Sequence, residues 1–536
     1  MAAVGVIALL FLSPLLALFS RIDRAALTET LASPGFARSL QATLVSAGLG
    51  GALSLAIAIY FARYFGLHDW RGKRLQRLLA LLPYLIPNFI LASAYVIAWN
   101  PASGLLNAWL PFPSGLYGLT GMIVLFAVTH APVALLMIED KFRRMDSSWR
   151  EAAQLSGARP ARILLRIELP ILLPTLLSAF ALCFTLNISA FAIPAWIGAP
   201  ERVYPLTYKV YQSIQVGGAE GIPQAASYSI VLFVLSLFPL ALAAWMGRQE
   251  RKFVLLSGKA SRKAPLPAQG VPFAAFQGVF WILQTVTWIA PLAVLAVSTL
   301  VRPGCLQQSG FSCLGDASLR SYSYVLFDLK ETRQAIEGSL AYGTLAALLI
   351  LALSLGALVL FSGHRSRLRA LELLFASLVA TPGAVLALGL IVTLSGRYGV
   401  NLYNTPWILV AAYVLKHASL AFQPAVTGLS GVSASLVEAA RLSGARTGRV
   451  WRGILLPILK PELMGGFFLV LIPILGELTM SVFLSSPSFR PIGSVLFDLQ
   501  DYADQASAAA LSILLVCMVL ALNELARLLS RGRLGY

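Results

Sequence analysis

The sequence predicts an all-α polytopic membrane protein with about twelve transmembrane helices, arranged as two parallel six-helix repeats. Of its 536 residues, 58% are hydrophobic and only 12% are charged, and the mean hydropathy is +0.78. Soluble domains average about 25% charged residues. Apolar stretches of roughly 20 residues, the length that crosses a bilayer, recur along the chain. A polar block of 24 residues occurs twice, at 151–174 and 438–461, with 15 identical positions at a constant offset of 287.

Twelve apolar stretches are predicted to span the membrane, with boundaries good to a few residues. They lie at residues 2–20, 37–62, 78–99, 116–138, 167–189, 223–247, 272–300, 337–361, 370–394, 405–427, 462–485 and 505–526. Pro87 and Pro382 each fall inside a stretch. The first stretch has no basic segment before it and no small-residue cleavage site, so we expect a retained helix and not a removed signal peptide.

The basic residues predict the orientation of these spans. With a cytoplasmic N-terminus, the inner loops and the C-terminal tail hold 29 of the 41 Lys and Arg residues. This positive-inside bias predicts a bacterial plasma (inner) membrane protein with both termini in the cytoplasm. A net charge of +18 could also indicate nucleic acid as a partner. We exclude nucleic acid, because the basic residues lie mostly in short loops between apolar stretches.

The duplicated block divides the chain into two halves. At the same offset His130 matches His417 and Pro200 matches Pro487. Six spans in each half is an even number, which gives both halves the same orientation, as in parallel repeats. We therefore predict a first half at 1–250, a basic cytoplasmic linker at 251–271 and a second half at 272–536.

The duplicated block itself is predicted to be a short surface helix followed by a turn. Ser147 and Ser148 are good N-cap residues, and Glu151 falls in the first turn, where a carboxylate is favoured. Gly157 allows a sharp turn, and Pro170 opens or kinks the following span. A loop that merely connects two spans usually varies freely. The shared identities therefore indicate a shared function, most simply a docking surface.

At this point the block resembles a known signature. EAA, three residues, Gly, nine residues and then I-x-LP is similar to the loop of permease subunits of binding-protein-dependent ABC importers. The matching residues are Glu151, Ala152, Ala153, Gly157 and Pro170 in the first copy, and Glu438, Ala439, Ala440, Gly444 and Pro457 in the second. The resemblance covers nearly the whole chain and implies a type I ABC importer permease fold, with each block forming a coupling helix that docks on an ATPase.

The resemblance also implies the partners. They are two copies of a cytoplasmic ABC ATPase, a periplasmic or extracellular substrate-binding protein and the lipid bilayer. The chain has no glycine-rich phosphate loop, since Gly258-Lys259 is followed by Ala260. We therefore expect no enzymatic activity and no cofactor bound by this chain, with ATP and Mg on the partner ATPase. No His, Cys and carboxylate cluster has metal-ligand spacing, so we expect no metal site.

The cargo is predicted from a narrower resemblance. One chain with two fused halves looks like the permeases of iron(III), thiamine and some phosphonate and polyamine systems. The stretches 381–390 and 476–487 look most like those of iron(III) permeases. The prediction is iron(III) transport, with thiamine, phosphonate or polyamine as alternatives.

Several single residues leave two interpretations open. Glu477 is either a substrate-pathway residue or a structural hydrogen-bonding group, and Asn187 is a weaker pathway candidate. His130 and His417 favour interhelical hydrogen bonds over a proton relay, and Lys416 either pairs with a carboxylate or faces the cavity. In the outer loop Cys305 and Cys313 form a disulfide or stay as two free thiols.

Two other classes of protein are weighed against the importer. An ion-coupled secondary transporter also uses two parallel halves, but it needs membrane-embedded charged pairs, and only Glu477 and Lys416 are candidates. A membrane scaffold without transport activity would give no reason for twin blocks.

Overall fold

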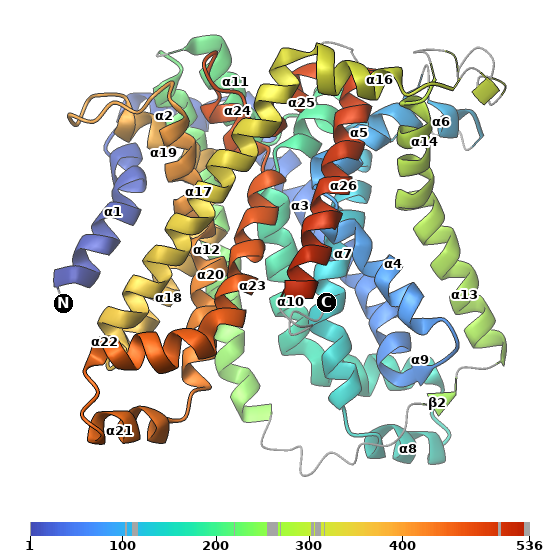
Figure 1. Cartoon of the computed structure of the whole chain (residues 1–536). Helices are drawn as coiled ribbons and strands as arrows, with labels where there is room; N and C mark the ends of the chain where they lie inside the picture. The colour runs from blue at the N-terminus through green and yellow to red at the C-terminus, as the bar shows by residue number, and fades with distance from the viewer. Residues whose placement is uncertain are drawn as a thin grey trace. The chain divides into compact units, whose positions relative to one another are not determined.

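The computed structural model describes residues 2–101, 104–109, 116–218, 220–253, 266–267, 270–301, 305, 312, 314–315, 317–501 and 505–529. The described chain is almost entirely helical and separates into two compact units, Leu27–Ala317 (unit 2) and Met1–Ala26 with Ser318–Tyr536 (unit 1). Helix α2, Arg24–Ala32, lies at the division between them. Figure 1 shows the order of the helices along the chain.

Unit 2 contains the helices and the strand pair that follow, in chain order. They are α3 (Pro34–Leu67), β1 (His68–Asp69), α4 (Lys73–Leu85), α5 (Asn88–Trp99), α6 (Leu105–Trp109), α7 (Gly118–Arg144), α8 (Ser148–Leu155), α9 (Pro160–Ile163), the π-helix η1 (Leu164–Glu168), α10 (Leu169–Ser189), η2 (Pro194–Gly198), η3 (Ala199–Glu201), α11 (Leu206–Gly217), α12 (Ile222–Phe253), β2 (Leu266–Pro267), α13 (Gly270–Gln284), η5 (Thr285–Ile289) and α14 (Ala290–Ser298).

Unit 1 contains α1 and the helices of the C-terminal part. They are α1 (Ala2–Phe19), α16 (Arg320–Ser323), η7 (Tyr324–Asp328), α17 (Lys330–Phe361), α18 (Arg365–Ala380), α19 (Gly383–Leu394), α20 (Pro406–Ser430), α21 (Ala434–Leu442), α22 (Thr447–Val450), η8 (Trp451–Leu455), α23 (Leu456–Leu475), α24 (Thr479–Leu484), α25 (Ile492–Asp501) and α26 (Gln505–Leu529).

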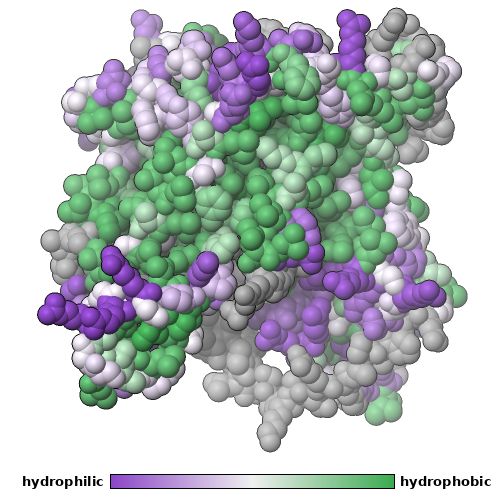
Figure 2. All heavy atoms as spheres, viewed as in Figure 1, coloured by the Kyte–Doolittle hydropathy of each residue, from purple (hydrophilic) through white to green (hydrophobic). Residues whose placement is uncertain are grey.

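The predicted polytopic membrane fold is confirmed. Within the described residues, nine helices are long and apolar enough to cross a membrane, or up to twelve if each of three bent pairs is one span. Over α17 and α23, the visible surface in Figure 2 is hydrophobic along its middle and hydrophilic at its ends, as a lipid-facing surface requires.

Two of the bends follow from proline. α4 and α5 meet at 95° beside Pro87, and α18 and α19 meet at 103° beside Pro382. Proline lacks an N–H and disfavours helical backbone at the residue before it, so each span breaks there.

A further predicted span is also broken. The stretch 462–485 is not a single helix, because α23 ends at Leu475 and α24 begins at Thr479. The break holds Gly476, Glu477 and Leu478, and the apolar residues on both sides of it hide it from hydropathy averaged over a window. The helical segment of this span instead begins at Thr447, inside the polar block.

The compact units cut across the two predicted halves. Phe276 and Phe280 of α13 are fully buried in the core of unit 2, where both contact Phe61 and Phe65 of α3. In unit 1, Phe11 of α1 packs on Phe375 of α18, with ring centroids 5.0 Å apart. The sequence repeat shows which segments were duplicated. The compact units instead depend on which helix faces bury one another, so the two divisions of the chain differ.

The predicted linker is described only at 266–267. There β2 pairs in parallel with β1, His68 opposite Leu266 and Asp69 opposite Pro267. Residues 254–265 and 268–269 lie outside the described part of the chain.

Candidate functional site

The two copies of the polar block fold in the same way, element by element. α9, η1 and α10 begin at residues 160, 164 and 169, and α22, η8 and α23 begin at 447, 451 and 456, which keeps the offset of 287 throughout. The short helices α8 and α21 precede them, each at one end of its own unit (Figure 1). The likeness of the sequence is therefore a likeness of structure.

A glycine ends each short helix in the left-handed conformation. Gly157 has φ +75° and donates to the carbonyl of Gln154 at 2.9 Å, and Ala158 N donates to the carbonyl of Ala153 at 2.9 Å. This pair of bonds is a Schellman motif. A Cβ at Gly157 would meet nothing within 4 Å, so the backbone conformation and not the available space requires glycine.

The second copy repeats the same turn. Gly444 has φ +79° and donates to the carbonyl of Arg441 at 2.9 Å, and Ala445 N donates to the carbonyl of Ala440 at 3.0 Å. The final alanine of each EAA triplet thus supplies the carbonyl that closes the helix. The predicted sharp turn after the helix is confirmed.

The prolines of the block explain the π-helical turns. Pro170 has no N–H to donate to a carbonyl four residues before it. The backbone before it widens, and Leu169 N donates to the carbonyl of Leu164 five residues back. Leu456, which precedes Pro457, donates to Trp451 in the same way. Each block therefore enters its span through one π turn.

The start of α8 differs from the prediction. Ser147 makes no side-chain cap. Instead Asp146 Oδ1 accepts from Ser148 N at 2.9 Å, since its carboxylate reaches the free N–H groups of the first turn. Glu151 lies in the first turn as predicted.

Both short helices lie on the surface, with a few half-buried residues, namely Arg150, Glu151 and Ala153 of α8 and Val437 and Ala440 of α21. No residue of 148–155 or 434–442, all of them described, is buried. Leu155 and its counterpart Leu442 are 91% and 90% exposed, and Trp149 and its counterpart Leu436 are also exposed. Matched apolar side chains on two exposed helices indicate surfaces made to be covered by a partner.

An ion-pair network surrounds the first copy and was not predicted. Glu168 of η1 is fully buried, and its two oxygens accept from Arg63 Nε at 2.7 Å and Arg150 Nε at 3.0 Å. The sequence offered one signal for this network. Glu168 is a carboxylate beside an apolar stretch, and the equivalent residue of the second copy is Leu455.

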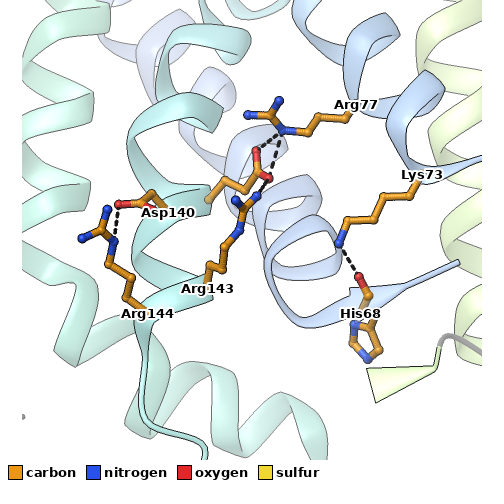
Figure 3. A network of polar contacts seen from close by, with 7 residues as sticks. His68, Lys73, Arg77, Asp140, Arg143 and Arg144 are labelled. Atoms are coloured by element: carbon orange, nitrogen blue, oxygen red, sulfur yellow. Dashed lines mark hydrogen bonds and ion pairs between the residues drawn. The ribbon is translucent and has the colours of Figure 1, made fainter. Parts of the chain in front are cut away.

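A second buried carboxylate lies nearby. Glu139 of α7 accepts from Arg77 of α4 at 2.7 Å and from Arg143 at 2.6 Å. Figure 3 shows both arginines reaching the same carboxylate, with Arg144 and Asp140 paired on another face of α7. The corresponding positions of the second copy are Val426 and Ser430.

His68 lies beside this network. Lys73 Nζ donates to its backbone carbonyl at 2.6 Å (Figure 3). Burial, followed by the charges of Arg63, Arg150 and Lys73, lowers the pKa of the His68 imidazole. The neutral form of the His68 imidazole is therefore favoured, because these three cations lie near it.

The interhelical role predicted for His130 is confirmed. Its Nδ1 lies 2.6 Å from Asn187 Oδ1, and Asn187 Nδ2 donates to the carbonyl of Ala47 at 3.0 Å. Asn187 thus joins α3, α7 and α10, and its carboxamide is engaged on both sides. In the second half Ile474 replaces Asn187, and His417 Nε2 has no hydrogen-bond partner among the described residues.

Two charged side chains bond to the backbone at helix breaks in unit 1. Lys416 Nζ donates to the carbonyls of Val379, at 2.9 Å, and Thr381, where α18 ends. Glu477 Oε2 accepts from Ser481 N at 3.1 Å in the first turn of α24. A cation at a helix C-terminus and an anion at an N-terminus both match the local dipole. The counterparts in unit 2 are Thr129 and Ala190.

The remaining predicted site residues are two cysteines of the outer loop. Cys313 lies outside the described residues, so its bridge to Cys305 stays a prediction. Among the described residues no group of three or more His, Cys, Asp or Glu could hold a metal ion.

The fold and the site define a class: a multi-pass membrane protein with two matched, exposed helices, each tied through a π turn to a span. The family model of the "binding-protein-dependent transport system inner membrane component" matches the chain twice, at residues 54–253 and 349–533. These matches cover more than half of the chain, and the chain belongs to this family.

Transport permeases of two bacteria are similar to parts of the chain. The putrescine transport system permease protein PotI of Escherichia coli is 25% identical over 181 residues, which is 32% of this chain and 57% of the relative. The putative 2-aminoethylphosphonate transport system permease protein PhnV of Salmonella typhimurium is 27% identical over 243 residues, 45% of this chain and 88% of the relative. The chain thus spans little more than half the length of the putrescine permease.

Proposed function

We propose that this chain is the membrane-spanning permease subunit of an ATP-binding-cassette importer, and that α8 and α21 dock on its ATPase subunits. One observation carries the proposal. Two surface helices without a buried residue, both ended by the same Schellman glycine, occur at equivalent places in the two repeats of a chain that belongs to a family of transport-system membrane components.

The geometry supports a mechanism for coupling. Gly157 and Gly444 fix the turn that follows each docking helix, and the short helices α9 and α22 then continue through one π turn into α10 and α23. Movement of a docked ATPase would therefore pull on α10 and α23. We expect two ATPase copies on the cytoplasmic side and a binding protein on the other, with both termini of the chain in the cytoplasm.

The test replaces both turn glycines. Gly157→Val with Gly444→Val forces a β-branched residue into a left-handed conformation. The matched control is Gly448→Val with Gly453→Val, two glycines of the same segment that lack positive φ and have open space around them. We expect the first pair to abolish ATP-dependent uptake and ATPase co-purification, with the control close to wild type. Unchanged coupling in the first pair would contradict the proposal.

Two cargo classes are proposed. The stretches at 381–390 and 476–487 resemble those of iron(III) permeases and support iron(III). The matched relatives are named for putrescine and 2-aminoethylphosphonate, both small organic amines, and support a polyamine or phosphonate cargo. Uptake of labelled iron(III), putrescine and 2-aminoethylphosphonate into cells with and without this chain separates them. Chain-dependent uptake of one compound selects its class.

We assign Glu477 to the substrate pathway, together with Lys416. Both are partly exposed ionisable groups in the membrane-spanning part of unit 1, and charges there are placed against water-filled cavities rather than lipid. The buried Asn187, whose carboxamide oxygen and nitrogen each make an interhelical hydrogen bond, is better explained by helix packing. Glu477→Gln should therefore slow uptake without preventing ATPase docking, whereas loss of docking would indicate a purely structural Glu477.

A further inference from the structure

The two docking helices are attached to their units by different chemistry. In unit 2 the guanidinium of Arg150, in the first turn of α8, donates to the fully buried Glu168. In unit 1 the same two positions are Val437 and Leu455. Neither can form an ion pair. The buried residues of the following elements α22 and η8 are apolar there, namely Val450, Trp451 and Leu455.

Glu168 connects α8 to more than its own segment. Its second oxygen accepts from Arg63 of α3 at 2.7 Å, 105 residues away along the chain. A carboxylate with two charge-assisted bonds is strongly oriented. The side chains of Glu168 and Arg150 are only 1% and 11% exposed, so water screens the pair weakly.

Arg63 belongs to α3, which packs closely on α7. At Gly66, three residues after Arg63, α3 and α7 approach so closely that a Cβ on this glycine would lie 2.7 Å from Phe142 Cβ. The second buried carboxylate, Glu139, then ties α7 to Arg77 of α4. A force on α8 therefore reaches α3, α7 and α4 through short, buried contacts.

We propose that Arg150, Glu168 and Arg63 form a bridge that positions α8, and that the two docking helices are mechanically unequal. α8 is attached to its spans by this ion-pair bridge, whereas residues 434–442 of α21, all of them described, form no ion pair and continue toward α22 through turn hydrogen bonds. The functional consequence rests on the proposed function: the first half transmits ATPase movement through a stiff connection, and the second through a compliant one.

The test is amide hydrogen exchange of the full chain in lipid nanodiscs, followed by ATPase stimulation in the reconstituted complex. Arg150→Val copies the second half and leaves Glu168 paired with Arg63, so the fold is kept. In Arg150→Val we expect the amide exchange rate of residues 148–155 to rise about tenfold, because α8 loses a charge-assisted bond. The exchange rate of residues 435–442 should stay unchanged. Arg150→Lys should restore part of the protection. Arg162→Val, an exposed arginine of the same segment, is the matched control.

Two outcomes overturn the inference. One is exchange of 148–155 in Arg150→Val equal to that of the wild type. The other is an equal rise in 435–442, which would indicate general loosening. The exchange measurement needs no ATPase, so its failure leaves the proposed function standing. A wild-type chain that neither binds nor stimulates an ATPase would contradict the proposed function, whatever the exchange rates are.

Discussion

The first and second copies of the duplicated block have nearly the same backbone and different anchoring. Gly157 and Gly444 adopt the same left-handed turn, and Pro170 and Pro457 follow the same π turn. Around this backbone, Glu168 is held by two arginines in one copy, and the buried apolar Leu455 takes its place in the other. Residues that dictate backbone conformation have been kept, whereas residues that only attach the segment have diverged.

The largest expected difference between the copies comes from charge at matched positions. Glu168→Gln keeps the volume but leaves Arg63 and Arg150 without a counter-charge, which should cost about 3–5 kcal/mol of unfolding free energy. Leu455→Met at the equivalent position should cost less than about 1.5 kcal/mol. Equilibrium unfolding of the purified chain in mixed micelles measures both. Equal losses would mean that charge does not distinguish the copies.

A smaller difference is expected inside the membrane. Asn187→Ile copies the second half and removes the partner of His130, which should cost about 1–3 kcal/mol because a buried polar group loses its bond. The reverse exchange, Ile474→Asn, should change stability by less, since interhelical hydrogen bonds average about 0.6 kcal/mol in membranes. The same unfolding measurement applies, and a larger effect of Ile474→Asn would break the comparison.

The turn glycines should behave alike in the two copies. Gly157→Ala and Gly444→Ala each place a Cβ in the left-handed region, at a cost of about 1–2 kcal/mol. Gly448→Ala, within the ordinary helix α22, should be neutral or stabilising by up to about 1 kcal/mol. Local hydrogen exchange of the two blocks gives the comparison. Different costs at Gly157 and Gly444 would show that the backbones are not under the same constraint.

The smallest expected effect is a pH dependence confined to the first copy. The lowered pKa of His68 means that the unfolded chain binds more protons below its ordinary pKa of about 6.5. This contribution to unfolding free energy is present above that pH and is lost as the pH falls through it. His68→Gln should therefore flatten the fall of stability between roughly pH 7 and 5. A slope identical to that of the wild type would contradict this role.

Features that depend on local chemistry could be predicted from the sequence. Hydropathy predicts the spans, and the repeat predicts the two turns, because glycine at positive φ and proline without an N–H act on the backbone around them. Pairings between distant segments could not be predicted. Glu168 meets Arg63 across 105 residues, and nothing in either segment specifies the other. The break after Leu475 was not predicted, because one charged residue, Glu477, does not end a long apolar stretch on a hydropathy scale. Its carboxylate accepts from Ser481 N in the first turn of α24, and hydropathy does not report such a contact.

The π turns make both blocks sensitive to the deletion of a single residue. Each turn holds one residue more than an α-helical turn, and one residue corresponds to a rotation of about 100° around the helix axis. Deleting a single residue from 164–168 would restore an α-helical repeat and swing the preceding helix to another side of its span. The same deletion in 451–455 would do the same to α21. The side of the span on which each docking helix lies thus depends on one inserted residue. The two halves carry this residue at equivalent positions.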